Sequence, residues 1–62
     1  MKGYWFIVLK NIIQIIDNKD INFLEITDYE YKFYNNIDGK KDLLCIIPKE
    51  NIEYIEWRKI ND

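Results

Sequence analysis

Six consecutive apolar side chains, running from Tyr4 to Leu9, open this chain, and three of the six are aromatic. A strand in a small two-layer protein usually alternates apolar and polar residues, because only one of its faces is buried. This segment does not alternate, so both of its faces need cover. We therefore expect a strand that fills the core with one face and meets another copy of the chain through the other.

The length of the chain, 62 residues, gives room for one domain, 1–62, with one small core. A folded chain of this size buries only about 60% of the surface that its unfolded form exposes, so its stability is marginal. Small folds often add disulfides, a metal or oligomerisation. One cysteine and no histidine leave neither a disulfide within the chain nor a plausible zinc site, and no cofactor is indicated. We therefore expect a homo-oligomer.

The charge and hydropathy patterns bear on partners and location. A net charge of −2 provides no global attraction to nucleic acid, so any such contact would be local. No stretch approaches the roughly 20 apolar residues that span a bilayer. Lys10 and Asn11 interrupt the first apolar run, and no small-residue cleavage site follows it. We expect a cytoplasmic protein with no membrane partner, which also suits a lone Cys45.

Residues with β-branched and aromatic side chains dominate the apolar runs, which predicts strands throughout and an all-β fold. The expected strands are 4–10, 21–27, 29–34, 42–47 and 52–58. Four isoleucines within 11–17 fit one helical face, but the segment is short, so it either continues the first strand or forms its hairpin partner. A C-terminal helix is the alternative for 52–60.

Turn chemistry separates these segments. Asp17–Asp20 favours a turn, since Asp and Asn bond to their own backbone. The pair Asp38-Gly39 is typical of a hairpin. Pro48 lacks the amide proton that a ladder needs, so 48–51 is expected to form a short 3₁₀ turn. Five short strands joined in this way predict a five-stranded small β-barrel or a strongly bent antiparallel sheet.

Two segments resemble the signatures of Sm-like proteins, which form small barrels of the SH3 type. Ile21–Ile26, which includes Asn22, is similar to the first signature, and Ile46–Ile55 is similar to the second. The resemblance covers up to about half of the chain. Pro48-Lys49 replaces the Arg-Gly turn of the family, and the spacing from the first strand to Asn22 is short. The resemblance implies a ring oligomer with Asn22 and Lys49 near a nucleotide pocket.

Catalytic chemistry has little support in the sequence. The chain has no serine and no histidine, and its only threonine, Thr27, has no evident partner base. Cys45 lies in an apolar run that favours an inert thiol. Three pairs of acidic residues show no calcium-loop spacing, and their carboxylates are expected to be solvated. They are Asp17 with Asp20, Asp28 with Glu30, and Glu53 with Glu56. The sequence therefore predicts that the protein is not an enzyme and has no catalytic or metal-binding residues.

An aromatic ladder with nearby cations suggests a ligand platform. Tyr29, Tyr31 and Phe33 share one face at a period of two, and bases stack on such ladders in small nucleic-acid-binding barrels. The predicted ligand-binding residues are Asn22, Tyr29, Tyr31, Lys32, Lys40 and Lys49. The alternative is that these rings form the core side of a hairpin or a subunit interface.

A second set of residues is expected to contact partners. Trp, Tyr and Arg are enriched at binding hot spots, and Trp57-Arg58 lies at the opposite end of the sequence from Trp5. One face of the first strand carries Trp5, Ile7 and Leu9, and the other carries Tyr4, Phe6 and Val8. The predicted interface residues are Tyr4, Trp5, Phe6, Ile7, Val8, Trp57 and Arg58.

The function expected from these observations is that of a non-enzymatic, oligomeric binding module. Its ligand would be a nucleotide or a single-stranded oligonucleotide. The alternative is an inhibitor that blocks a host defence protein through an aromatic patch. Ile, Asn, Lys, Tyr and Phe supply 36 of the 62 residues, and all have AT-rich codons. This bias suggests an AT-rich genome, such as that of a phage.

Overall fold

The computed structural model describes residues 2–11 and 14–61. These residues form strands and one 3₁₀ turn, and the expected all-β fold is confirmed. The six strands are β1 (Gly3–Leu9), β2 (Ile15–Ile16), β3 (Phe23–Ile26), β4 (Glu30–Ile37), β5 (Lys40–Pro48) and β6 (Ile52–Lys59).

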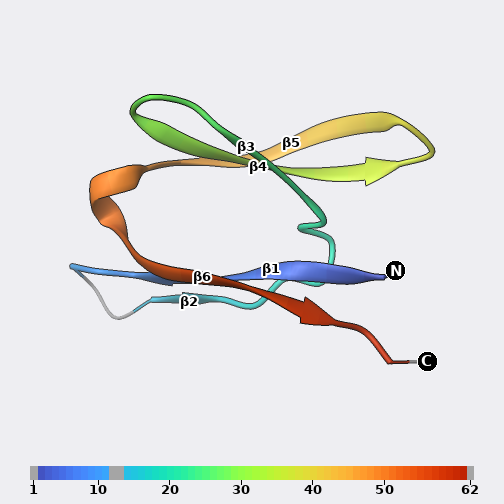
Figure 1. Ribbon diagram of the computed structural model, residues 1–62, viewed down its shortest axis with the longest axis horizontal. Helices are drawn as coiled ribbons and strands as arrows, with labels where there is room; N and C mark the ends of the chain where they lie inside the picture. The colour runs from blue at the N-terminus through green and yellow to red at the C-terminus, as the bar shows by residue number, and fades with distance from the viewer. Residues whose placement is uncertain (1, 12–13, 62) are drawn as a thin grey trace.

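The strands form two antiparallel sheets, which lie as two layers (Figure 1). One sheet has the order β2-β1-β6, and the other has the order β3-β4-β5. The 3₁₀ turn η1 (Lys49–Asn51) carries the chain from β5 in one layer to β6 in the other. Pro48 precedes it with extended backbone, φ −57° and ψ 140°. The 3₁₀ turn expected at 48–51 is therefore confirmed, with Pro48 as its N-cap.

The two layers do not close into a barrel, so the five-stranded closed barrel is wrong. On one side, the amide of Trp5 donates to the carbonyl of Ile21 at 2.7 Å, which links β1 to the segment entering β3. On the other side, β5 and β6 are the outer strands of separate sheets, and no backbone hydrogen bond joins them in the part of the chain that the structure describes. A barrel needs hydrogen bonds between its first and last strands.

The structure decides between the alternatives that the sequence left open for segments 11–17 and 52–60. Ile15 and Ile16 pair with Val8 and Ile7, so the second segment provides a hairpin partner for β1. Residues 12 and 13 of that segment lie outside the described residues. The last segment pairs with β1 along its whole length, so the helical alternative for 52–60 is wrong. Pairing with the central apolar strand explains why this segment extends despite its weak alternation.

The hairpin between β4 and β5 has the turn that its sequence predicts. Asp38 has φ 52° and Gly39 has φ 82°, as a two-residue type I′ turn requires. This tight turn lets pairing begin at Ile37 and Lys40. The two strands are therefore longer than expected, and residues 35–37 and 40–41 belong to the ladder rather than to a loop.

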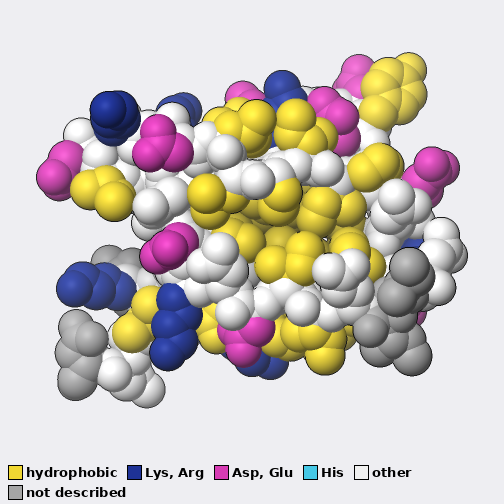
Figure 2. Space-filling view, turned by 180° about the vertical axis from the view of Figure 1, so that it is seen from behind, with side chains coloured by type: hydrophobic (Ala, Val, Ile, Leu, Met, Phe, Trp, Pro, Cys, Tyr) yellow, Lys and Arg dark blue, Asp and Glu magenta, His cyan; other side chains and the backbone are white. Residues whose placement is uncertain are grey.

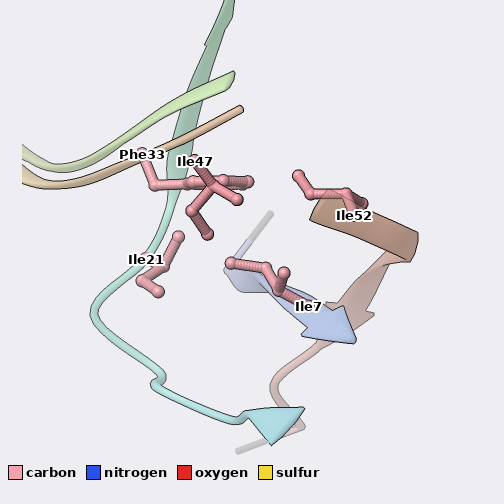
Figure 3. Close-up of a cluster of buried hydrophobic side chains, with 5 residues drawn as sticks. All are labelled: Ile7, Ile21, Phe33, Ile47 and Ile52. Atoms are coloured by element: carbon pink, nitrogen blue, oxygen red, sulfur yellow. The ribbon is translucent and has the colours of Figure 1, made fainter. Parts of the chain in front are cut away.

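The core lies between the layers and draws side chains from both of them (Figure 3). Each of its members is at most 8% exposed. They are Ile7, Ile21, Phe33, Ile47 and Ile52. Burying an apolar side chain of this size contributes roughly 1.5–3 kcal/mol. The core is small, as the length of the chain requires.

Both faces of β1 are covered within one chain. Its inner face packs Trp5, Ile7 and Leu9 toward the core. On its outer face, Tyr4 and Phe6 are each only 6% exposed. The Arg58 guanidinium lies 3.5 Å from the centre of the Phe6 ring, and the Tyr54 ring lies 6.5 Å from it. The apolar surplus of this strand is therefore accommodated by β6, without requiring a second copy.

Candidate functional site

A cleft of about 380 Å³ opens at the end of the molecule where β1 begins and β6 ends. Four separate segments contribute to it: the start of β1, the turn before β3, the last part of β4 and the end of β6. Its lining residues are Lys2, Gly3, Lys19, Asn22, Asn36, Trp57 and Ile60. The volume falls within the range of roughly 300–1,000 Å³ that ligand pockets span.

Trp57 provides the aromatic wall of the cleft. It lies opposite Trp5 in the β1–β6 ladder, and the two rings meet edge to face with centroids 5.2 Å apart and planes at 66°. Its position depends on Gly3, because a Cβ at that residue would lie 2.5 Å from two carbons of the Trp57 ring. The ring remains 38% exposed, so part of its surface is available to a ligand.

A carboxamide network fixes the opposite wall. The Asn22 side chain accepts a hydrogen bond from the Asn36 amide at 2.6 Å and donates to the Asn36 carbonyl at 3.1 Å. It also donates to Oδ1 of Asn35 at 3.3 Å. These bonds extend the β3–β4 ladder beyond the start of β3. Asn36 Oδ1 is buried and has no hydrogen-bond partner among the residues that the structure describes.

Lysine side chains give the cleft its charge. Lys2 and Lys19 line it, and the lining residues that the structure describes include no Asp or Glu. Lys19 belongs to a short turn in which the Asn18 side chain accepts the Asp20 amide at 2.9 Å and the Asn18 carbonyl accepts the Ile21 amide at 3.1 Å. Two lysine side chains in the lining favour a negatively charged ligand.

The predicted aromatic ladder does not form one platform. Phe33 is fully buried, and Tyr31 packs against the core beside it, with ring centroids 6.3 Å apart. Tyr29 lies in the bend before β4 and is 85% exposed. The alternative interpretation, in which the ladder is the core side of a hairpin, therefore describes Tyr31 and Phe33.

The predicted ligand-binding lysines lie apart from one another. Lys49 in η1 places its Nζ 5.8 Å from the centre of the Tyr31 ring. Lys32 lies in the middle of β4, opposite Glu25 and Ile46. Lys40 begins β5 beside the hairpin turn. Of the predicted ligand-binding residues, Asn22 alone lines the cleft, and its carboxamide is already bonded to Asn36.

An aromatic pair that the sequence analysis did not single out lies on the outer face of the second sheet. Phe23 and Tyr34 meet edge to face with centroids 5.9 Å apart, and Lys41 Nζ lies 4.7 Å from the centre of the Phe23 ring. The Tyr34 hydroxyl donates to Glu25 at 2.8 Å, and this hydrogen bond to a carboxylate raises the pKa of Tyr34. The neighbouring carboxylate makes this pair a poor site for an anion.

The predicted interface residues separate into three groups. Tyr4, Phe6 and Ile7 are buried within the chain, while Trp5 and Val8 are half-buried. Trp57 lines the cleft. Arg58 covers Phe6 and forms an ion pair with Glu56 at 2.9 Å.

Two kinds of feature are absent from the described ranges, 2–11 and 14–61. No three His, Cys, Asp or Glu side chains of these ranges converge as a metal-binding group. No helix within them has the length and apolar character needed to cross a bilayer.

Comparison of the chain with protein-family models, with curated proteins and with solved structures finds no match in any of the three. The resemblance to Sm-like proteins therefore rests on the two segments alone, and the implied ring oligomer stays a prediction.

Most residues of the cleft could not be found from the sequence. Lys2, Lys19 and Asn36 come from segments with no shared motif, and the fold alone brings them together. One local signal was present: Gly3 begins a strand whose other residues all carry large side chains. A glycine within a strand often marks the close approach of another group, which here is the Trp57 ring.

Proposed function

We propose that this protein is a non-enzymatic binding module whose cleft takes a nucleotide. The observation that supports this most strongly is the combination, in one cleft of about 380 Å³, of an indole ring with two lysine side chains. A nucleotide presents a planar base and an anionic phosphate at opposite ends. The cleft offers a complementary group for each.

The base would pack against the exposed part of Trp57. Stacking of a base on an aromatic side chain contributes about 1–3 kcal/mol. The phosphate would lie between Lys2 and Lys19, which act as charged donors. The Asn22 carboxamide is already hydrogen-bonded to the Asn36 backbone, so little ordering of this wall is required when the ligand binds. Nothing in this arrangement calls for a chemical step.

Binding is tested by titrating the purified protein with a panel of mono-, di- and cyclic nucleotides, using tryptophan fluorescence and isothermal calorimetry. The key variant is Lys19→Gln, because Lys19 is exposed and its loss should not unfold the chain. A hydrogen bond to a charged group contributes about 1.5–3 kcal/mol, so the variant should bind at least about tenfold more weakly. The affinity should also fall with rising salt.

Lys59→Gln is the matched control, since Lys59 is also exposed but does not line the cleft. It should bind as the unmodified protein does. The proposal fails if no nucleotide binds at millimolar concentration, or if Lys19→Gln and Lys59→Gln bind equally well.

A further inference from the structure

Strand β5 presents a long free edge. It has nine residues, and its ladder runs to β4 on one side only. Among the described residues, no additional backbone hydrogen bond involves 40–47. An edge of this kind offers a row of amide and carbonyl groups to another strand, and natural proteins usually protect it with charges, proline or short length.

The middle of β5 has little of this protection. Five consecutive residues, Leu43–Ile47, carry no charge, whereas Lys40, Lys41 and Asp42 begin the strand and Pro48 ends it. Three of them are large apolar side chains with substantial exposure: Leu43 at 50%, Leu44 at 42% and Ile46 at 45%. The register shift in the β4–β5 ladder inserts Leu44, which is itself apolar. On the face drawn in Figure 2, hydrophobic side chains gather across the middle of the molecule, with charged groups around them.

The other sheet edges differ from β5. Strand β2 has two residues and β3 has four, so neither offers a long ladder. Strand β6 is eight residues long but carries charges along its length, at Glu53, Glu56, Arg58 and Lys59. Length and an uncharged centre occur together only in β5 among the edges that the structure describes.

We propose that β5 pairs antiparallel with β5 of a second copy of this chain, about a twofold axis near Cys45. Such an axis is normal to the sheet, so each face of one copy continues the same face of the other. Leu43 lies opposite Tyr34, and Ile46 lies opposite Lys32, which places both on the outer face. With Cys45 opposite Cys45, Ile46 of one copy would lie opposite Leu44 of the other, next to Leu43, and this contact is repeated by symmetry.

Charge selects the antiparallel arrangement. Lys40, Lys41 and Asp42 begin β5, and Lys49 and Glu50 follow its end in η1. Antiparallel pairing about Cys45 places Lys40 of one copy opposite Glu50 of the other and Asp42 next to Lys49, and leaves Lys41 opposite Lys49 as the one like-charge pair at each end. Parallel pairing would place the lysines of both copies together and cause repulsion. The antiparallel direction thus brings opposite charges together at each end, whereas in-register parallel pairing would place every charge beside the same charge of the other copy, and this favours a second, antiparallel copy as the occupant.

The pairing would join the two β3-β4-β5 sheets into one continuous sheet. It would leave the nucleotide cleft open, because the cleft is lined by β1, β4, β6 and adjoining turns and by no residue of β5. The pairing is therefore independent of the proposed ligand and can be tested without it.

The test is the mass of the protein in solution, measured by native mass spectrometry and sedimentation equilibrium between about 1 and 200 μM. We expect a dimer whose dissociation constant rises at least tenfold in Leu43→Lys and in Ile46→Lys. Both side chains are about half exposed, so circular dichroism should show folded monomers. Ile26→Lys is the matched control, because Ile26 is 60% exposed on β3 at the opposite edge of the same sheet. It should remain dimeric.

Cys45, the only cysteine in the chain, supplies a second test. Opposed residues in antiparallel strands have Cα atoms about 4.5–5.5 Å apart, which suits a disulfide. Oxidation by copper–phenanthroline and air should give a covalent dimer in the unmodified protein and much less of it in Ile46→Lys. The proposal is overturned if the unmodified protein is monomeric at 200 μM, if Ile26→Lys dissociates it as Ile46→Lys does, or if both forms cross-link equally.

Discussion

Strands β1 and β5 are both rich in apolar residues, yet β1 is buried on both faces and β5 on only one. In β1, Ile7 is fully buried, and Tyr4 and Phe6 on the opposite face are each 6% exposed. In β5, Ile47 is 8% exposed, but Ile46 on the opposite face is 45% exposed. The difference shows that the position of a strand in its sheet, and not its hydrophobicity alone, determines how many of its faces are covered.

The physical reason lies in the neighbours of each strand. Strand β1 has β2 on one side and β6 on the other, so side chains from both can lean over its outer face. Arg58 does so by lying over Phe6. A long side chain can cover apolar surface with its stem while its charged end stays in water. Strand β5 has a neighbour on one side only, and its outer face stays open.

The strongest test of this contrast is a pair of truncations. Ile7→Ala should lower the free energy of unfolding by about 2–5 kcal/mol, because it leaves a cavity in a core that cannot fully collapse. Ile46→Ala should change it by less than about 1 kcal/mol, as for most substitutions at exposed positions. Urea denaturation followed by tryptophan fluorescence measures both values.

The unfolding measurements should be made at a low concentration, where the proposed dimer contributes little. Equal losses for Ile7→Ala and Ile46→Ala would contradict the contrast, since they would mean that β5 is as well buried as β1.

A second test compares the glycines that precede or begin the two strands. Gly3→Ala should destabilise the fold by about 1–3 kcal/mol through overpacking, because the new Cβ would meet the Trp57 ring at 2.5 Å and the Arg58 carbonyl at 2.7 Å. It should also weaken nucleotide binding by moving Trp57. Thermal denaturation and fluorescence titration measure these two effects.

Gly39 is the matched position before β5. It has φ 82°, and no atom lies within 4 Å of the position that a new Cβ would occupy. A substitution there would therefore strain the backbone without causing a steric clash. Gly39→Ala should cost about 1–2 kcal/mol, and Gly39→Asn should recover much of that loss, since Asn tolerates this conformation. A full loss in Gly39→Asn would argue against the type I′ turn.

The smallest expected effect concerns the thiol of Cys45. Partial burial raises its pKa by desolvation, so less thiolate is present at any given pH than for a free cysteine. Alkylation by iodoacetamide at pH 8 should therefore be slower in the folded chain than in urea, by up to about tenfold. The rate should continue to rise with pH beyond the usual range of a thiol.

The alkylation rate of Cys45 should also depend on protein concentration, because the proposed β5 pairing would bury this thiol further. Alkylation should be slowest at high protein concentration in the unmodified protein and independent of concentration in Ile46→Lys. A rate in the folded chain equal to that in urea would show that Cys45 is not buried.

Local patterns predicted much of the fold. The all-β class, the hairpin at Asp38-Gly39 and the 3₁₀ turn after Pro48 all follow from propensity and turn chemistry, which depend on neighbouring residues. The candidate site was largely missed. Lys2 and Trp57 are far apart in sequence, and neither has a motif that signals the other.

The sequence by itself determined where strands and turns form, and that the first strand needs cover on both faces. The tertiary structure alone decided what supplies that cover. It placed β1 between β2 and β6, so that the chain buries Tyr4 and Phe6 itself. It also left β5 at an edge. The reason is that propensity and alternation act over a few residues, whereas the order of strands depends on pairing between distant segments.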